Sequence, residues 1–293
     1  MSFSGTHTAL ITPFRDGVVD VPAFQALIER QIEGGVDGIV PVGTTGESPT
    51  LDSHEHLEVI KLAVEFADGR CQVIAGTGAN ATLEAIELTE KAEALGATGS
   101  LQVCPYYNKP SQEGLYRHFN AVAESTSLPI MLYSIPGRSV IEIATETAAR
   151  LANDCDNITA IKEAGGSVDR VNQLVQDCPD DFQILSGDDP LTLPFISCGA
   201  TGLVSVTSNI IPGEMARLVR ACLNGSFDEA LALQKQYYPL MRGLMSLDVN
   251  PVPVKTAAYL MGHCTPELRL PLCPMPDEQI GQLKSLLEDF NLL

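Results

Sequence analysis

The feature that most constrains the fold is a repeated alternation of short apolar runs with segments of helical periodicity. The eight runs are rich in β-branched residues and read "TALITPF", "GIVPVG", "QVIAGTG", "GSLQVCPYY", "PIMLYSIP", "ITAIKEA", "FQILSGDD" and "GLVSVTSN". Unbroken apolar runs are typical of parallel strands that are covered on both faces. Eight strand-then-helix units within about 225 residues predict an α/β fold, a (β/α)8 TIM barrel, rather than an open sheet of five or six strands.

The segments between the runs have the spacing of amphipathic helices. Residues 21–34, for example, place Phe24, Leu27 and Ile28 on one face and stop at a glycine pair. Further helical patterns follow the eighth unit, and no Ser/Gly/Pro-rich linker precedes them. We therefore expect residues 1–225 to form the barrel and residues 226–293 to form a C-terminal helical extension packed as part of the same unit. Pro239 is expected to kink or break the first helix of the extension.

The composition excludes several classes of partner. With 18 basic and 37 acidic residues the formal net charge is -19, and such a surface repels phosphate backbones and anionic lipid. We expect no nucleic-acid or membrane partner, and any bound carboxylate needs a local cation. The eight cysteines form no C-x-x-C pair and mostly have apolar neighbours, which predicts buried, unpaired thiols. No signal-peptide layout or membrane-length apolar run is seen, so the expected location is cytoplasmic.

In a (β/α)8 barrel the active site lies at the carboxyl ends of the strands, so the residues that follow each run are the candidates. Lys162 lies within the run "ITAIKEA", and lysine is among the residues least often buried unless it is paired or reactive. Burial in an apolar barrel would lower the pKa of its amine and make it a nucleophile able to form a Schiff base with a ketone. The run alone leaves open a solvated strand-end lysine whose stem reaches water.

Three further strand ends carry candidate groups. The loop "GTTGES", residues 43–48, offers hydroxyls and backbone N–H groups to a carboxylate, or is a glycine-rich turn whose threonine caps the next helix. Tyr107 and Tyr133 end consecutive units and either relay protons or cover the core. Arg138 follows Tyr133 on a Pro-Gly turn and is a candidate local cation, unless it pairs with a surface acid.

Other patterns argue against cofactor and metal chemistry. "GTGANA" matches a dinucleotide fingerprint formally, but the acid expected about 20 residues further on is missing. His54 and His56 are two residues apart on an expected helix and so lie on different faces, and no HExxH motif occurs. Asp188 and Asp189 precede a proline and are interpreted as a helix N-terminus. We expect neither a metal nor a cofactor.

Taken together, the strand ends resemble the dihydrodipicolinate synthase family from "ALITPF" to "LRLPL". The resemblance rests on "GTTGES", "AGTGAN", "PYYNKPSQEGLYRHF", "YSIPGRS", "IKEA", "LSGDD" and "NPVPVK" in this order. It implies that Lys162 forms an imine with pyruvate, whose enamine adds to L-aspartate-4-semialdehyde to give 4-hydroxy-tetrahydrodipicolinate on the route to lysine and diaminopimelate, without a cofactor. The roles it implies are a proton relay of Thr44, Tyr107 and Tyr133, a pyruvate carboxylate site at Thr45, a site for the second substrate's carboxylate at Arg138, and a pyruvate-lining backbone at Val204.

The resemblance also implies an assembly and a regulatory site. Family members are commonly tetramers of tight dimers, in which a tyrosine matching Tyr107 reaches into the neighbour. A lysine-binding pocket at the dimer interface matches Ser48, His56, Asn80, Glu84 and Tyr106. Pro49 and Ser53 depart from the residues usual there, alanine and histidine, so weak to moderate inhibition by lysine is expected.

Alternatives to this function remain. "YSIPGRS" has serines at positions 134 and 139, where asparagine and threonine are common in the family. Relatives that cleave sialic acid or deoxy sugar acids share the lysine, the tyrosine and the GxTGE loop. A pyruvate-dependent aldolase for another aldehyde is therefore the alternative, and a catalytically silent metabolite-binding barrel is the alternative from a different class. A dinucleotide-dependent oxidoreductase is weaker than either.

Overall fold

The computed structural model describes residues 2–293 and contains a closed barrel of eight parallel strands. In space the strands follow the order β1-β10-β9-β8-β7-β6-β5-β4. Their bounds are β1 (Gly5–Ala9), β4 (Gly38–Val40), β5 (Gln72–Gly76), β6 (Gly99–Val103), β7 (Ile130–Ser134), β8 (Ile158–Glu163), β9 (Gln183–Ser186) and β10 (Gly202–Ser205). The remaining two strands, β2 (Phe14–Arg15) and β3 (Val18–Val19), form a small antiparallel hairpin after β1. The predicted (β/α)8 barrel is confirmed.

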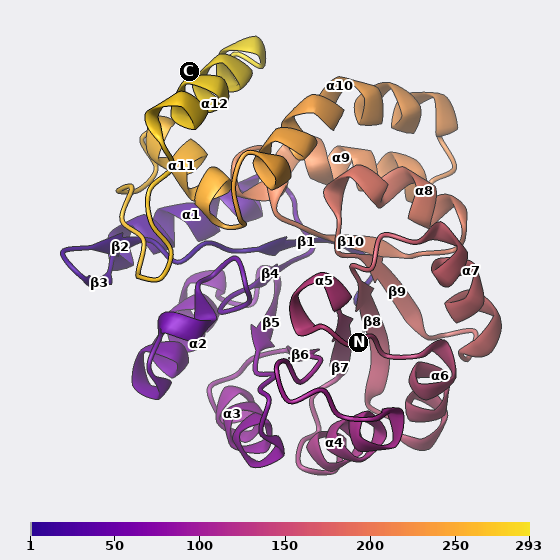
Figure 1. The fold of residues 1–293 in the computed structure, drawn as a ribbon. Helices are drawn as coiled ribbons and strands as arrows, with labels where there is room; N and C mark the ends of the chain where they lie inside the picture. The colour runs from indigo at the N-terminus through magenta and orange to yellow at the C-terminus, as the bar shows by residue number, and fades with distance from the viewer. Residues whose placement is uncertain (1) are drawn as a thin grey trace.

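Helices surround the barrel, as Figure 1 shows. Those of the eight units are α1 (Val21–Glu33), α2 (Ser53–Ala67), α3 (Thr82–Ala94), α4 (Gln112–Glu124), α5 (Pro136–Ser139), α6 (Thr145–Asp154), α7 (Val168–Asp177), α8 (Thr192–Ser197) and α9 (Pro212–Leu223). Single 3-10 turns are η1 (Ser48–Thr50), η2 (Asp189–Leu191) and η3 (Thr207–Asn209). Three helices follow the last unit, namely α10 (Phe227–Ser246), α11 (Val252–Leu260) and α12 (Asp277–Asp289). α10 lies beside α9, and α11 packs on α12 (Figure 1).

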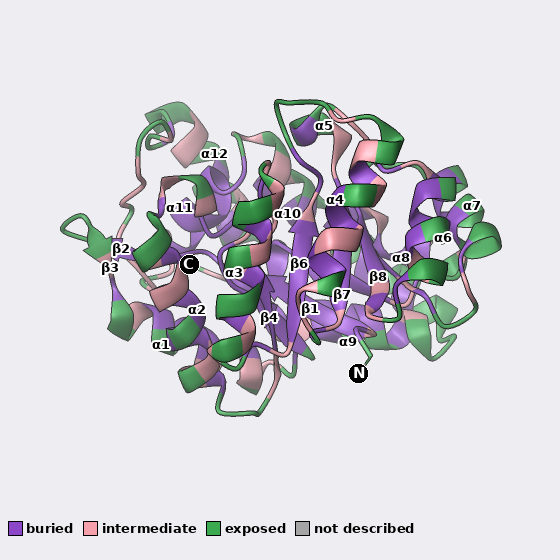
Figure 2. Cartoon of the chain, turned by 90° about the horizontal axis from the view of Figure 1, so that it is seen from below, coloured by how far each residue is buried: buried purple, intermediate pink, exposed green. Residues whose placement is uncertain are grey.

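Apolar side chains form separate cores inside and outside the barrel. The inner core is narrow and contains Phe3, Ala9, Val40, Ile74, Leu101, Met131, Tyr133, Ala160, Leu185 and Val204. Two larger clusters fill the layer between the strands and the helices. Figure 2 shows this layering, with buried strands and exposed outer helix faces. The strands are therefore covered on both faces, which accounts for their unbroken apolar runs.

Two local features differ from the sequence-based expectation. β1 begins at Gly5, before the apolar run "TALITPF", and the polar residues at its start are buried, which the apolar pattern does not reveal. The His7 ring, for example, lies 2.7 Å from the carbonyl of Phe3, and the Thr8 hydroxyl donates to Gln31 over 2.7 Å. The break expected at Pro239 is absent, because α10 continues through Pro239 from Phe227 to Ser246.

Two further observations concern the cysteine thiols and the apolar character of the helices. All eight cysteines have free thiols. Among the helices of residues 2–293, none combines the length and the apolar character that a membrane crossing requires.

Candidate active site

Lys162 and Tyr133 face each other at the carboxyl ends of neighbouring strands. They are register partners between β8 and β7, so their side chains point the same way, into the barrel. The Lys162 Nζ lies 4.2 Å from the centroid of the Tyr133 ring, and the two residues are 6% and 5% exposed. The interpretation of Lys162 as a solvated strand-end lysine is therefore wrong.

Burial changes the acidity of both groups. It lowers the pKa of Lys162 to about 8, although Asp189 nearby acts in the opposite direction and Arg138 adds to the decrease. At pH 7 roughly a tenth of such an amine is neutral and nucleophilic. Burial also raises the pKa of Tyr133 to about 12, against the smaller effects of Arg138 and the Thr44 hydroxyl. The site thus combines a usable amine with a phenol that keeps its proton.

A glycine makes room for the lysine stem. A Cβ atom at Gly187 would lie 3.0 Å from Cε of Lys162 and 2.8 Å from Cβ of Ala164. Because real Cβ atoms are essentially never found 2.8 Å from a neighbour, a side chain at Gly187 would force Ala164 to shift and would crowd the stem of Lys162. Gly187 follows β9 directly, so this space lies beside the strand end that borders β8.

The loop that follows β4 is a compact turn. The N–H groups of Gly46 and Ser48 both donate to the carbonyl of Gly43, over 3.1 and 3.3 Å. The turn does not cap the next helix, because Asp52 caps α2 in a capping box with Glu55. The hydroxyl of Thr45 is buried and accepts a hydrogen bond of 3.1 Å from the Asn250 amide.

Arg138 reaches the site from the short helix α5, at the mouth of the barrel. Its guanidinium donates to the backbone carbonyl of Asn250 over 3.0 Å, and the residue is otherwise exposed. No ion pair forms between Arg138 and any acid of the described chain. Asn250 therefore contacts both the Thr45 loop and the Arg138 loop.

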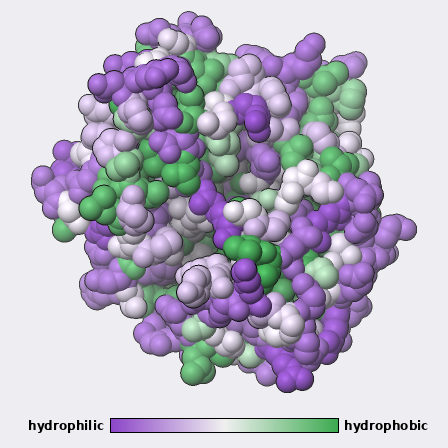
Figure 3. Space-filling view, in the orientation of Figure 1, coloured by the Kyte–Doolittle hydropathy of each residue, from purple (hydrophilic) through white to green (hydrophobic). Residues whose placement is uncertain are grey.

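One cavity of about 370 Å³ brings many of the predicted residues together. Figure 3 shows this face of the molecule, which is hollowed near its centre and bordered by both hydrophilic and hydrophobic side chains. Of the sequence-predicted site residues, those that line the cavity are Thr44, Ser48, His56, Glu84, Tyr106, Tyr133 and Arg138. Pro49 and Ser53 line it too. Some of the expected catalytic residues and most of the expected regulatory residues thus share one cavity.

Five predicted residues do not line this cavity. Lys162 and Thr45 are buried, and Val204 is 1% exposed within the inner core of the barrel. The amide of Asn80 donates to the carbonyl of Tyr106 at 3.5 Å. Tyr107 is 87% exposed and points away from the core, and its φ of 73° is unusual for a tyrosine.

His56 and Ser48 are hydrogen-bonded at the cavity wall. The ring Nε2 of His56 lies 2.8 Å from the carbonyl of Gly76, and its Nδ1 lies 3.4 Å from the Ser48 hydroxyl. Because a carbonyl only accepts, Nε2 carries the proton and Nδ1 accepts from the serine. Burial lowers the pKa of His56, so the ring is neutral near pH 7.

Two groups near the site were not among the functional candidates read from the sequence. Glu47, in the "GTTGES" loop, forms a buried ion pair with Lys255 of "NPVPVK". Asp189 does begin a 3-10 turn, but its fully buried carboxylate accepts hydrogen bonds from Ser205 and from the N–H groups of Val206 and Thr207. Burial raises the pKa of Asp189, and those hydrogen bonds oppose the increase. Its interpretation as a helix N-terminus alone was incomplete, because strand packing brings it near Lys162.

No group of three or more His, Cys, Asp or Glu side chains in residues 2–293 is arranged to hold a metal ion.

Comparisons with known proteins agree over the whole chain. The profile of the Dihydrodipicolinate synthetase family matches residues 2–290. A 4-hydroxy-tetrahydrodipicolinate synthase of Persephonella marina is 52% identical over 292 residues, which cover 99% of each chain.

Solved structures are equally similar. A dihydrodipicolinate synthase of Aquifex aeolicus superposes with a TM-score of 0.98 at 47% identity, covering 99% of each chain. A dihydrodipicolinate synthase of Cyanidioschyzon merolae, solved with lysine bound, superposes with a TM-score of 0.96 at 41% identity, covering 99% of each chain.

Proposed function

This chain belongs to the dihydrodipicolinate synthetase family, and on that premise we propose that its site condenses pyruvate with L-aspartate-4-semialdehyde to give 4-hydroxy-tetrahydrodipicolinate. The chain is therefore a lyase. The observation that carries the proposal is the buried Lys162 amine, beside the Tyr133 phenol on the neighbouring strand. A carbonyl substrate that enters the barrel mouth meets a nucleophile and a proton donor together.

The reaction begins with the neutral amine of Lys162. It attacks the ketone of pyruvate, and loss of water from the carbinolamine leaves a protonated imine. Loss of a methyl proton then gives an enamine, whose carbon attacks the aldehyde of the second substrate. The amino group of that substrate finally attacks the imine carbon, which closes the ring and releases Lys162. One water is formed in all, and the protonated imine accepts the electron pair without help from a cofactor.

The surrounding residues fit the steps of this reaction. We assign proton transfer to Tyr133 and Thr44, which line the same cavity, with Tyr107 completing the relay from a neighbouring subunit. Thr45 is assigned to the pyruvate carboxylate, and the backbone of Val204 to the pyruvate side. Arg138, free of any acidic partner in the described chain, is assigned to the carboxylate of aspartate semialdehyde.

The test is reductive trapping at several pH values. Incubation with pyruvate and borohydride is expected to add one reduced pyruvate, and peptide mapping is expected to place it on Lys162. Because the reactive form is the neutral amine, trapping should speed up as the pH rises toward the pKa of about 8 and level off above it. Below pH 7 the rate should fall about tenfold per pH unit.

Two outcomes would contradict this proposal. A folded protein that takes up no label has no reactive amine and is a metabolite-binding barrel. A labelled protein that consumes a sugar-derived aldehyde, but not aspartate semialdehyde, is a different pyruvate-dependent aldolase. Mass spectrometry of the protein and of the products separates these cases.

We infer that the chain works as a homodimer and assembles further into a homotetramer. The support is the exposed Tyr107, whose backbone conformation presents the ring to solvent, next to Tyr106 and with Leu83 exposed as well. A large aromatic residue displayed in this way is typical of an interface anchor.

The eight free thiols are compatible with the cytoplasm, the location we propose, because that compartment keeps thiols reduced.

We also propose that free lysine binds at Ser48, His56, Glu84 and Tyr106, with Asn80 holding the Tyr106 backbone. A lysine-bound relative supports this proposal. Glu84 is exposed at the cavity edge, and its carboxylate can accept hydrogen bonds from an ammonium group of the ligand. The neutral His56 ring adds no repelling charge.

Isothermal titration tests lysine binding. Glu84→Ala is expected to weaken it by about tenfold, because a charge-assisted hydrogen bond is lost. Glu87→Ala, one turn further on the same helix, should leave it unchanged, because Glu87 pairs with Lys91 on the surface. No uptake at millimolar lysine by the wild-type protein would refute the site.

Sedimentation of the same sample reports whether the dimer is present.

A further inference from the structure

A buried ion pair lies directly behind the reactive lysine. Glu163 follows Lys162 on β8, and since side chains alternate along a strand it points away from the barrel interior. There its carboxylate accepts a hydrogen bond of 2.8 Å from Nε of Arg170, which lies on α7. The side chains of Glu163 and Arg170 are 0% and 9% exposed, respectively. The reaction steps assigned above use neither residue.

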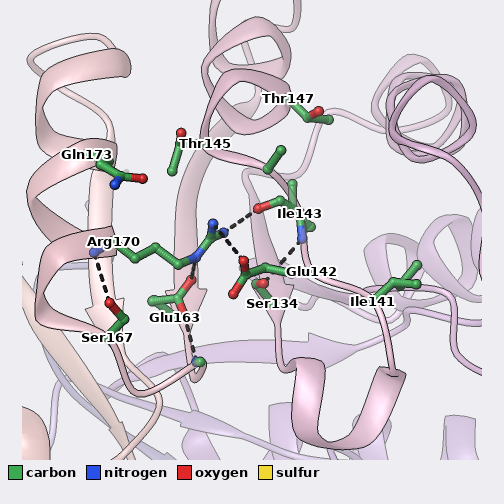
Figure 4. A network of polar contacts seen from close by, with 12 residues as sticks. Ser134, Ile141, Glu142, Ile143, Thr145, Thr147, Glu163, Ser167, Arg170 and Gln173 are labelled. Carbon is green, nitrogen blue, oxygen red and sulfur yellow. Dashed lines mark hydrogen bonds and ion pairs between the residues drawn. The ribbon is translucent and has the colours of Figure 1, made fainter.

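The same guanidinium also holds the chain segment that follows β7. Its Nη2 donates to the backbone carbonyl of Ile143, and its Nη1 lies 3.4 Å from the carboxylate of Glu142. Figure 4 shows Arg170 at the centre of these contacts, between the end of β8 and the segment at Glu142 and Ile143. One side chain therefore ties the strand of Lys162 to residues 135–144.

That segment carries Arg138 and is internally stiff. The N–H groups of Arg138 and Ser139 both donate to the carbonyl of Ile135, over 2.9 Å. The Ser139 hydroxyl lies within hydrogen-bonding distance of the carbonyls of Ile135 and Ile141, at 2.9 and 2.7 Å. Because these hydrogen bonds tie residues 135–141 together, we expect a shift at Ile143 to move Arg138 as well.

We propose that Arg170 is a positioning residue, which fixes the distance between the pyruvate imine on Lys162 and the carboxylate site at Arg138. The inference rests on the proposed function and adds a specificity element to it. Lys162 sets where the enamine carbon lies, and Arg138 sets where the second substrate is held. Productive attack needs both, and a misplacement of about 1 Å can slow a reaction by roughly a hundredfold.

The chemistry of the contacts explains why arginine stands here. The planar guanidinium donates from Nε to Glu163 and from Nη2 to Ile143 at the same time, in fixed directions. A lysine supplies one charge at one point and cannot span both acceptors. Glu163 and Glu142 balance the buried positive charge, so the arginine is held without an unpaired ion.

Arg170→Lys separates the two roles of the side chain, because it keeps the charge beside Glu163 and loses the hold on Ile143. We expect the KM for aspartate semialdehyde to rise about tenfold and kcat to fall with it, because the enamine carbon and the aldehyde are no longer aligned. The KM for pyruvate, and the rate of borohydride trapping on Lys162, should change less than about twofold, since Lys162 and Tyr133 are held by the strands β8 and β7 and the charge beside Glu163 is kept. Arg217→Lys, in the exposed pair with Glu229, is the matched control and should alter neither KM.

Gln112 provides a second variant that does not disturb the buried pair. From the exposed side it donates to the carbonyl of Glu142 over 2.8 Å and accepts from the N–H of Ala144 over 3.0 Å. Gln112→Ala should raise the KM for aspartate semialdehyde in the same direction by a smaller factor. If Arg170→Lys fails to fold by circular dichroism, this variant decides the question.

The outcomes are distinct. An unchanged KM for aspartate semialdehyde in the folded variants, or an equal rise for both substrates, overturns the positioning role and leaves the proposed function intact. Failure of the wild-type protein to trap pyruvate overturns the proposed function instead. A selective rise for the second substrate, with normal trapping, supports both.

Discussion

Lys162→Ala is expected to lower kcat by roughly a thousandfold or more and to abolish the reduced pyruvate adduct. Without the amine no imine forms, and the pyruvate methyl group loses the electron sink that makes it acidic enough to react. The cavity, the Arg138 cation and the Tyr133 phenol remain, so both substrates should still bind. Steady-state kinetics and intact-mass analysis after borohydride treatment measure the two effects.

The control for this substitution is Lys61→Ala. Lys61 lies on α2, is about half exposed and makes only loose ion pairs of 3.8 Å with Glu58 and Glu65. Its removal should leave kcat and labelling unchanged. Wild-type kcat in Lys162→Ala would mean that catalysis does not pass through an imine. Labelling that persists at another residue would mean that the wrong lysine has been identified.

Lys255→Met is expected to lower the free energy of unfolding by about 3 kcal/mol, with a fall in Tm of several degrees. Lys255 and Glu47 are 1% exposed or less, and the ammonium also lies 4.1 Å from the centroid of the Phe14 ring. Removing the lysine leaves the Glu47 carboxylate buried with one remaining hydrogen bond, of 3.1 Å from the N–H of Arg269. Such an uncompensated charge is costly because water cannot reach it.

The double variant Glu47→Leu/Lys255→Met distinguishes charge from packing. It removes both ions at once, so it should recover much of the stability that Lys255→Met loses. Lys91→Met, in the exposed pair with Glu87, should change stability by less than about 1 kcal/mol. Thermal and urea unfolding measure all three variants. Equal effects of Lys255→Met and Lys91→Met would show that burial adds nothing to this pair.

Local pattern was enough to predict the barrel and the position of Lys162. The strand runs are apolar because both faces of each strand are covered. The helix α10, which is 20 residues long, coincides with the helical pattern that begins at Phe227. Lys162 stood out because a charged residue interrupts such a run, and the structure confirms its burial. These signals lie within a few residues of one another in the sequence, which is why sequence periodicity reveals them.

Contacts between distant segments could not be predicted in this way. Glu47 and Lys255 are 208 residues apart, and Thr45 and Asn250 are 205 apart. In neither pair do the residues adjacent in the sequence indicate which distant residue is the partner. The resemblance pointed to both loops by motif, but it did not say that an ion pair and an amide join them. The roles assigned to all the site residues, Lys162 included, and the division of the chain at residue 225 stay predictions.

Residues that hold the mouth of the barrel, Asn250 among them, lie well beyond the last barrel strand in the sequence. The barrel closes at β10, so all eight strands lie before residue 206. The amide that holds Thr45, the carbonyl that holds Arg138 and the ammonium that neutralises Glu47 all come from residues 250–255. A chain shortened after α9 would keep every strand and lose the parts that set the shape of the barrel mouth. The segment that must be inherited or recombined together to keep the active site is thus longer than the segment that forms the closed barrel.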